Sequence, residues 1–152
     1  MTPSFLRAQV IAERSAWIRD MLEKLKSLPL ESFASFISDR RNPASAESYL
    51  RRTLEALLDL GRHILAKGFG LAVTEYKEIA QRLIEQGILK VDDGRVLEKM
   101  AGYRNRMVHF YQEISNRELY EICTREAGDV ERMLEALLKW VNDHPEKIDR
   151  SL

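Results

Sequence analysis

Residues 46–65, AESYLRRTLEALLDLGRHIL, carry the clearest helical pattern in the chain. Apolar residues recur here at spacings of three and four, which place them on one face of a helix. The residues on this face are Ala46, Tyr49, Leu50, Leu54, Leu57, Leu58, Gly61, Ile64 and Leu65. Charged side chains occupy the opposite face, so the stretch predicts a long helix that packs against other helices. Asn42-Pro43 predicts its start, with Asn42 as the N-cap and Pro43 in the first turn.

Similar patterns on both sides of this helix predict the remaining elements. We expect a first helix from Thr2-Pro3 to the residue before Pro29, followed by a short helical turn within 30–42. Three further helices are expected after the central one: from Thr74 to Gly87, from Asp92 or Asp93 into residues 103–111, and from Ser115 to His144. Thr74 and Ser115 are expected to act as caps. Alternation with period two is nowhere long enough to predict a strand. The sequence therefore predicts an all-α, up-and-down bundle of four to five helices, with residues 1–152 as one domain and a polar tail from about 144.

Composition limits the classes of function. The chain has 152 residues and equal numbers of basic and acidic side chains, 24 of each, so any nucleic-acid ligand would need a local basic patch. Residues 61–111 hold nine Lys or Arg against six Asp or Glu, whereas residues 112–152 hold six against ten. The single cysteine, Cys123, excludes an intrachain disulfide and is expected in the core. We find no signal-peptide pattern or membrane-spanning run, so a cytoplasmic protein without membrane contact is expected.

The most reactive stretch is Tyr103-Arg104-Asn105-Arg106-Met107-Val108-His109-Phe110-Tyr111. Arginine is a fixed cation that binds phosphate through two parallel hydrogen bonds, and histidine changes charge near neutral pH. Asn105 and His109 are four apart and share a helix face, and Arg104 is long enough to reach that face. The plain structural reading is that both arginines are solvated, His109 caps a helix end and Tyr111 packs on the rim.

Other common catalytic patterns lack their residues. We find no Gly-rich phosphate loop, no His-Glu-x-x-His zinc motif and no cysteine pair. Asp59 and His63 are four apart on one helix, but two ligands do not make a metal site. No metal and no cofactor is therefore expected.

The string Arg-Asn-x-x-Val-His-x-Tyr resembles the signature Arg-x-x-x-x-His-x-Tyr of HepT-like toxins in the HEPN superfamily, and residues 46–61 resemble the second helix of those proteins. The resemblance spans about 32–141. It implies a metal-independent endoribonuclease that acts on RNA as a homodimer and forms the toxin of a type VII toxin–antitoxin system. It also implies an MntA-like nucleotidyltransferase antitoxin that adenylylates a tyrosine.

The same resemblance implies roles for individual residues. Arg104 and His109 are expected to be catalytic, Asn105 and Asp39 to support them, and Tyr111 to accept AMP. Two alternatives remain open, namely a non-catalytic helical partner that docks a nucleotidyltransferase and holds a nucleotide, and a purely structural bundle. The intact pair of Arg104 and His109 favours the nuclease over both.

Overall fold

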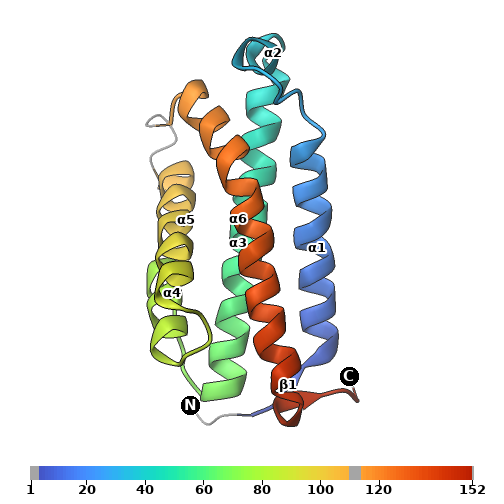
Figure 1. The fold of residues 1–152 in the computed structure, drawn as a ribbon, viewed down its shortest axis with the longest axis vertical. Helices are drawn as coiled ribbons and strands as arrows, with labels where there is room; N and C mark the ends of the chain where they lie inside the picture. The colour runs from blue at the N-terminus through green and yellow to red at the C-terminus, as the bar shows by residue number, and fades with distance from the viewer. Residues whose placement is uncertain (1–3, 110–113, 152) are drawn as a thin grey trace.

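The computed structural model describes residues 4–109 and 114–151, most of which are helical (Figure 1). In chain order the elements are β1 (Leu6–Arg7), α1 (Ala8–Lys26), α2 (Phe33–Ile37), α3 (Arg41–Phe69), α4 (Tyr76–Glu85), α5 (Val91–His109), α6 (Asn116–Asp143), the 3-10 helix η1 (Pro145–Lys147) and β2 (Ile148–Asp149). The predicted all-α bundle is confirmed, and α2 is the short helical turn expected in the connector. None of the helices in the described ranges is both long and apolar enough to cross a membrane.

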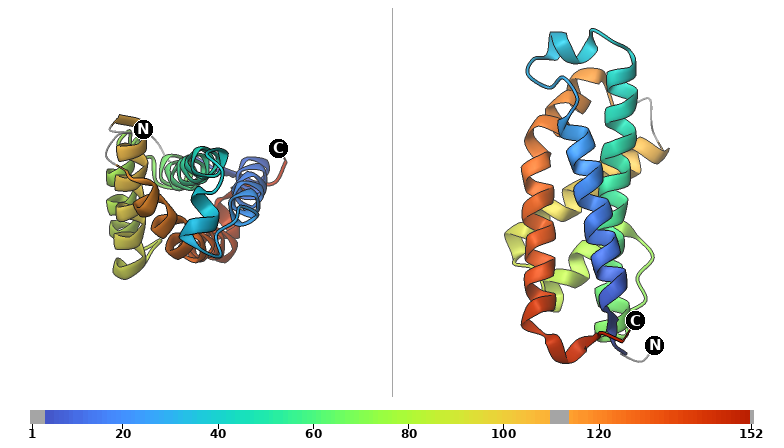
Figure 2. Two further views of the ribbon diagram at one scale, coloured as in Figure 1. Left: turned by 90° about the horizontal axis from the view of Figure 1, so that it is seen from above. Right: turned by 90° about the vertical axis from the view of Figure 1, so that its right-hand side faces the viewer.

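Helix α3 is the centre of the bundle. It runs beside α1 and α6, and the shorter pair α4 and α5 packs against it on the other side (Figures 1 and 2). Its leucine-rich face, predicted from residues 46–65, is buried except for the partly buried Tyr49, and Leu50, Leu57, Leu58 and Ile64 are fully enclosed. Because α3 contacts every other α-helix, it fixes where each one lies.

Two glycines let α4 approach both of its neighbours closely. A Cβ atom added to Gly94 of α5 would lie 2.2 Å from Cγ1 of Ile84. A Cβ atom added to Gly61 of α3 would lie 3.0 Å from a methyl carbon of Leu83. Both distances are shorter than ordinary carbon contacts. A side chain at position 94 would displace Ile84, whereas one at position 61 would require a shift of only a few tenths of an ångström.

The two ends of the chain meet in a small feature that the sequence did not predict. Leu6 and Arg7 pair in parallel with Ile148 and Asp149, where a first helix and a polar tail were expected. The first helix begins only at Ala8, and its expected start at Thr2-Pro3 lies outside the described residues. Strands of two residues are too short to show a periodic pattern, which explains why they were missed.

Three further predicted helix starts are wrong. Helix α5 begins at Val91, so Asp92 and Asp93 lie in its first turn and neither is the N-cap. Helix α3 begins at Arg41, so Asn42 lies inside it and is not the N-cap. The carboxylate of Asp39 instead accepts a hydrogen bond from the Arg41 N–H at 2.9 Å, and this satisfies a first-turn donor from outside the helix. Helix α4 has Glu75 rather than Thr74 at its N-cap.

The start of α6 agrees with the prediction. Ser115 is the N-cap, and its Oγ accepts a hydrogen bond from the Glu118 N–H at 3.1 Å. Cys123 is buried in the core as expected, and burial raises the pKa of its thiol to about 12. A thiol with so high a pKa is not a reactive nucleophile near neutral pH.

The close approach at Gly94 gives a test of the packing. Substituting Gly94→Ala should destabilise the protein by about 1–3 kcal/mol, because the added methyl group overpacks against Ile84. The matched control is Gly128→Ala in α6, where an added Cβ would meet nothing within 4 Å. This control should be neutral or stabilising by roughly 0.5–1 kcal/mol, because alanine favours helix over glycine. Urea unfolding measures both variants, and equal effects would contradict the packing described here.

Candidate active site

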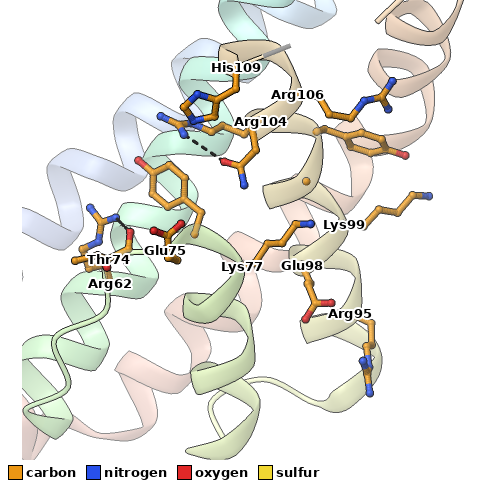
Figure 3. A pocket seen from close by; sticks show the side chains of 14 residues that line it. Arg62, Thr74, Glu75, Lys77, Arg95, Glu98, Lys99, Arg104, Arg106 and His109 are labelled. Carbon is orange, nitrogen blue, oxygen red and sulfur yellow. Dashed lines mark hydrogen bonds between the residues drawn. The ribbon is translucent and has the colours of Figure 1, made fainter. Parts of the chain in front are cut away.

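A cleft of about 820 Å³ lies between α4 and α5, next to the middle of α3 (Figure 3). Two carboxylates, Glu75 and Glu98, line it together with six cations: Arg62, Lys77, Arg95, Lys99, Arg104 and Arg106. His109 lies at one end of the cleft and Arg95 at the other (Figure 3). The positive surplus noted in residues 61–111 is therefore concentrated on one surface, which suits an anionic ligand.

Arg104 is more enclosed than a surface arginine, with its side chain 19% exposed. Its Nη2 donates to Oε2 of Glu55 at 3.5 Å, and its Nη1 donates to Oδ1 of Asn105 at 3.3 Å. Its Cζ lies 4.6 Å from the centre of the Tyr76 ring. Residues from α3, α4 and α5 therefore hold this guanidinium in place.

The guanidinium of Arg104 is held but not saturated. Its Nε is buried and has no hydrogen-bond partner within residues 4–109 and 114–151. Its hydrogen bonds to Asn105 and Glu55, at 3.3 and 3.5 Å, are long compared with the 2.7–2.9 Å usual for a charged pair. A phosphate that enters the cleft could therefore accept hydrogen bonds from terminal N–H groups that the protein binds only weakly.

His109 ends α5 and lines the same cleft as Arg104. Its side chain is exposed, and Figure 3 shows its ring on the same side of α5 as Arg104. Asn105 lines the same cleft. The five-residue spacing brings the two groups together because the arginine side chain reaches along the helix toward its last turn. The structure thus unites Arg104, Asn105 and His109, as the sequence predicted.

Arg106 has a structural partner as well as a place in the cleft. It donates two hydrogen bonds to the carboxylate of Glu118 in α6, at 2.5 and 3.1 Å. This ion pair lowers the pKa of Glu118 and ties the end of α5 to the start of α6. Arg106 therefore fixes the orientation of the segment that carries His109.

Asp39 is not brought to the cleft. Its carboxylate pairs with Arg41 at 2.6 Å, and hydrogen bonds from Arg41 lower the pKa of Asp39 to about 2. Arg41 precedes Glu55 by fourteen residues of α3, which corresponds to about 20 Å along the helix axis. Asp39 thus closes the α2–α3 junction, and the carboxylate next to Arg104 is Glu55.

The expected AMP acceptor, Tyr111, lies outside the described residues. The described chain stops at His109 and resumes at residue 114. The role of Tyr111 is therefore considered below as a proposal.

Sequence reasoning missed two supporting residues, Glu55 and Tyr76. The carboxylate of Glu55 forms two ion pairs, one with Arg51 at an N–O distance of 2.6 Å and one with Arg104 at 3.5 Å. Tyr76 donates its hydroxyl hydrogen to Asp59 at 3.2 Å and has Arg62 as well as Arg104 near its ring. Burial and the charge of Asp59 raise the pKa of the Tyr76 hydroxyl, so it stays neutral as a donor.

Asp59 and His63, four apart on α3, have separate partners. Asp59 pairs with Arg62 at 3.0 Å, whereas Nε2 of His63 accepts a hydrogen bond from the Arg7 N–H at 3.3 Å. Burial and the nearby charges of Arg14, Lys67 and Arg7 lower the pKa of His63 to about 4. Across the described residues, no three His, Cys, Asp or Glu side chains gather closely enough to hold a metal ion.

The arrangement matches the needs of phosphoryl chemistry on a polyanion. A fixed cation can stabilise the negative charge that develops on a pentacoordinate phosphate, and a solvent-accessible histidine can accept or donate a proton. Both groups line one cleft with a surplus of positive charge. The fold and the cleft together define an all-α bundle with an Arg/His cleft between two of its helices.

Comparison with known proteins gives the family. A model described as ribonuclease HepT-like matches residues 18–137, so this chain belongs to the HepT-like family. The match covers the central helix and the Arg/His motif. A comparison with curated protein sequences gives no match.

Solved structures with the same fold include toxins bound to antitoxins. One is a tri-AMPylated HEPN toxin of Shewanella oneidensis in complex with an MNT antitoxin, which is 21% identical, with a TM-score of 0.77 over 86% of this chain and 97% of the toxin chain. Another is a toxin–antitoxin structure with AMP-PNP, 20% identical, with a TM-score of 0.76 over 84% of this chain and 97% of the other. The cytosolic protein YutE of Bacillus subtilis, of unknown function, is 16% identical, with a TM-score of 0.79 over 96% of this chain and 98% of YutE. At these identities the likeness concerns the fold.

Proposed function

We propose that this protein is an endoribonuclease that cleaves RNA without a metal ion and serves as the toxin of a type VII toxin–antitoxin pair in the cytoplasm. The observation that carries the proposal is that Arg104 and His109 line one cationic cleft. Membership of the HepT-like ribonuclease family supports it.

The proposed chemistry uses the groups of the cleft directly. The ribose 2′-oxygen attacks the adjacent phosphorus while the bond to the leaving 5′-oxygen breaks. His109 takes the proton from the 2′-hydroxyl or supplies one to the leaving oxygen. Arg104 donates hydrogen bonds to the non-bridging oxygens, whose negative charge grows in the transition state. Asn105 supports Arg104 by accepting from its Nη1.

We also propose that the active form is a homodimer with its motifs near the two-fold axis, because an isologous interface would double a site that has one Arg and one His. Light scattering should give the mass of a dimer at micromolar concentration. A monomer that retains full cleavage activity would rule out this part of the proposal.

The first experiment is cleavage of a mixed-sequence RNA by the purified protein in excess EDTA. The wild type should cleave, and His109→Ala should be slower by about a hundredfold or more, in line with the loss of a general acid or base. Arg104→Ala should lose about a hundredfold to a thousandfold, as expected when a charge-stabilising donor is removed. Of the two new ends, the 3′ end should carry a 2′,3′-cyclic phosphate and the 5′ end a hydroxyl group.

The control variant is Arg125→Ala, which removes an arginine that is 62% exposed, does not line the cleft and, within the described residues, has Glu121 one turn away on α6 as its ion-pair partner. It should cleave like the wild type. Activity of His109→Ala at the wild-type rate would show that the assigned role is wrong. A wild type that binds nucleotide but cleaves no RNA would favour the non-catalytic partner.

A second proposal concerns control by an antitoxin. We propose that an MntA-like nucleotidyltransferase attaches AMP to Tyr111, two residues after His109. A toxin of the same fold is tri-AMPylated in its complex with an MNT antitoxin, which supports this proposal. The added phosphodiester would carry a negative charge next to Arg104 and compete with the RNA phosphate for the same hydrogen bonds.

Co-expression with such a nucleotidyltransferase, followed by mass spectrometry, tests the assignment to Tyr111. The wild type should gain the mass of AMP and lose RNA cleavage, whereas Tyr111→Phe should gain no mass, because it lacks the acceptor oxygen. Tyr103→Phe is the matched control and should still be modified. An AMP increment that persists in Tyr111→Phe would place the modification on another residue.

A further inference from the structure

Among the residues that the structure describes, two cations of the cleft differ from the other four in having no carboxylate partner. Arg62, Lys99, Arg104 and Arg106 each form an ion pair. Lys77 and Arg95 are exposed and form no ion pair with any residue in the described ranges. Two carboxylates line the same cleft, so the missing pairs do not reflect a lack of acidic residues nearby.

Their positions extend the cleft away from the catalytic motif. The Nζ of Lys77 lies 4.0 Å from the point where a Cβ of Gly102 would be, so its ammonium lies beside α5 at a residue two positions before Arg104. Arg95 precedes Arg104 by nine residues of α5, which is about 13 Å along the axis. Figure 3 shows Lys77 between Arg104 and Arg95. The free cations therefore continue a line that begins at His109 and Arg104.

The two carboxylates restrict where a polyanion could lie along this line. Glu98 accepts a hydrogen bond from Nε2 of Gln81 at 3.3 Å, and Glu75 is exposed at the N-cap of α4. Both would repel a phosphate placed beside them. Phosphates would thus be confined to positions near Lys77 and near Arg95, which suits separate phosphates of one strand better than a single small anion.

We propose that Lys77 and Arg95 bind backbone phosphates of a single-stranded RNA beyond the scissile bond, so that the substrate strand runs along the α4–α5 cleft. This inference rests on the proposed function for its substrate class and adds the path of the strand. Lysine and arginine contacts of this kind give affinity without reading sequence. The protein should therefore prefer strands longer than a dinucleotide.

The test is the salt dependence of binding to a fluorescent twelve-nucleotide RNA, measured in the full-length His109→Ala protein so that the strand stays intact. Adding Lys77→Ala and Arg95→Ala should weaken binding and reduce the slope of log K against log salt by about 1.4, because each phosphate contact on a single strand contributes about 0.7. The factor by which affinity falls between 50 and 200 mM salt should then be about sevenfold smaller in this variant than in the His109→Ala parent.

The matched control adds Lys24→Ala and Lys139→Ala to His109→Ala. These lysines are exposed and lie outside the cleft, and within the described residues each pairs with an acid one turn away. Both double additions remove two positive charges, so the net charge changes equally. The control should keep the slope of the His109→Ala parent. Equal slopes and affinities for the two double additions would overturn the inference and assign the free cations to an acidic protein partner.

A cleavage assay separates this inference from the proposed function. In the protein with an intact His109, the Lys77→Ala/Arg95→Ala pair should reduce kcat/KM for the twelve-nucleotide RNA and leave that for a dinucleotide unchanged. If wild type cleaves nothing while the slope still falls by the predicted amount, the strand path stands and the catalytic proposal fails. If cleavage depends on His109 but the slope is unchanged, the catalytic proposal stands and the strand path fails.

Discussion

The enclosure of the Arg104 guanidinium is the constraint that links the fold to the cleft. An arginine stays charged in a protein, so one that is 19% exposed needs nearby groups to replace the water it has lost. Glu55 on α3 and the Tyr76 ring on α4 provide them. Because these groups come from different helices, Arg104 can be held only when α3, α4 and α5 are packed together. The cation that would meet a phosphate is thus positioned by the tertiary structure and not by its own helix alone.

The positions of these helices depend on two glycines at the contacts between them. Gly94 allows α4 to lie against α5 at a distance at which a methyl group would clash with Ile84, and Gly61 allows a tight contact of α4 with α3. This places Tyr76, at the start of α4, under Arg104 and between the two arginines that contact its ring. The Arg106–Glu118 pair then joins the end of α5 to α6. The packing of α4 against α5 and the Arg106–Glu118 ion pair at the end of α5 together set the position of Arg104 and His109.

Much of this could be predicted from the sequence, for identifiable reasons. The leucine spacing of α3 and the Ser115 cap are local signals, and both were confirmed. Arg104, Asn105 and His109 were found because their residue types are unusual within one helix. Glu55 and Tyr76 were missed because their role depends on contact with Arg104, which lies 49 residues after Glu55 and 28 residues after Tyr76 in the chain. Their local spacing is typical of any amphipathic helix. The N-cap of α3 was placed wrongly because Asp39 satisfies its first turn from outside, in competition with the Asn42-Pro43 signal.

The role that we propose for Arg104, positioned by Glu55, is to stabilise the reacting phosphate. A double-mutant cycle on single-turnover RNA cleavage tests it most directly, with Glu55→Gln, Arg104→Ala and the two together. Glu55→Gln alone should slow cleavage by about tenfold, and in the Arg104→Ala background the same change should alter the rate by less than about twofold, because its effect passes through the arginine. The same tenfold loss in both backgrounds would contradict the account, as would an Arg104→Ala protein that cleaves RNA at the wild-type rate.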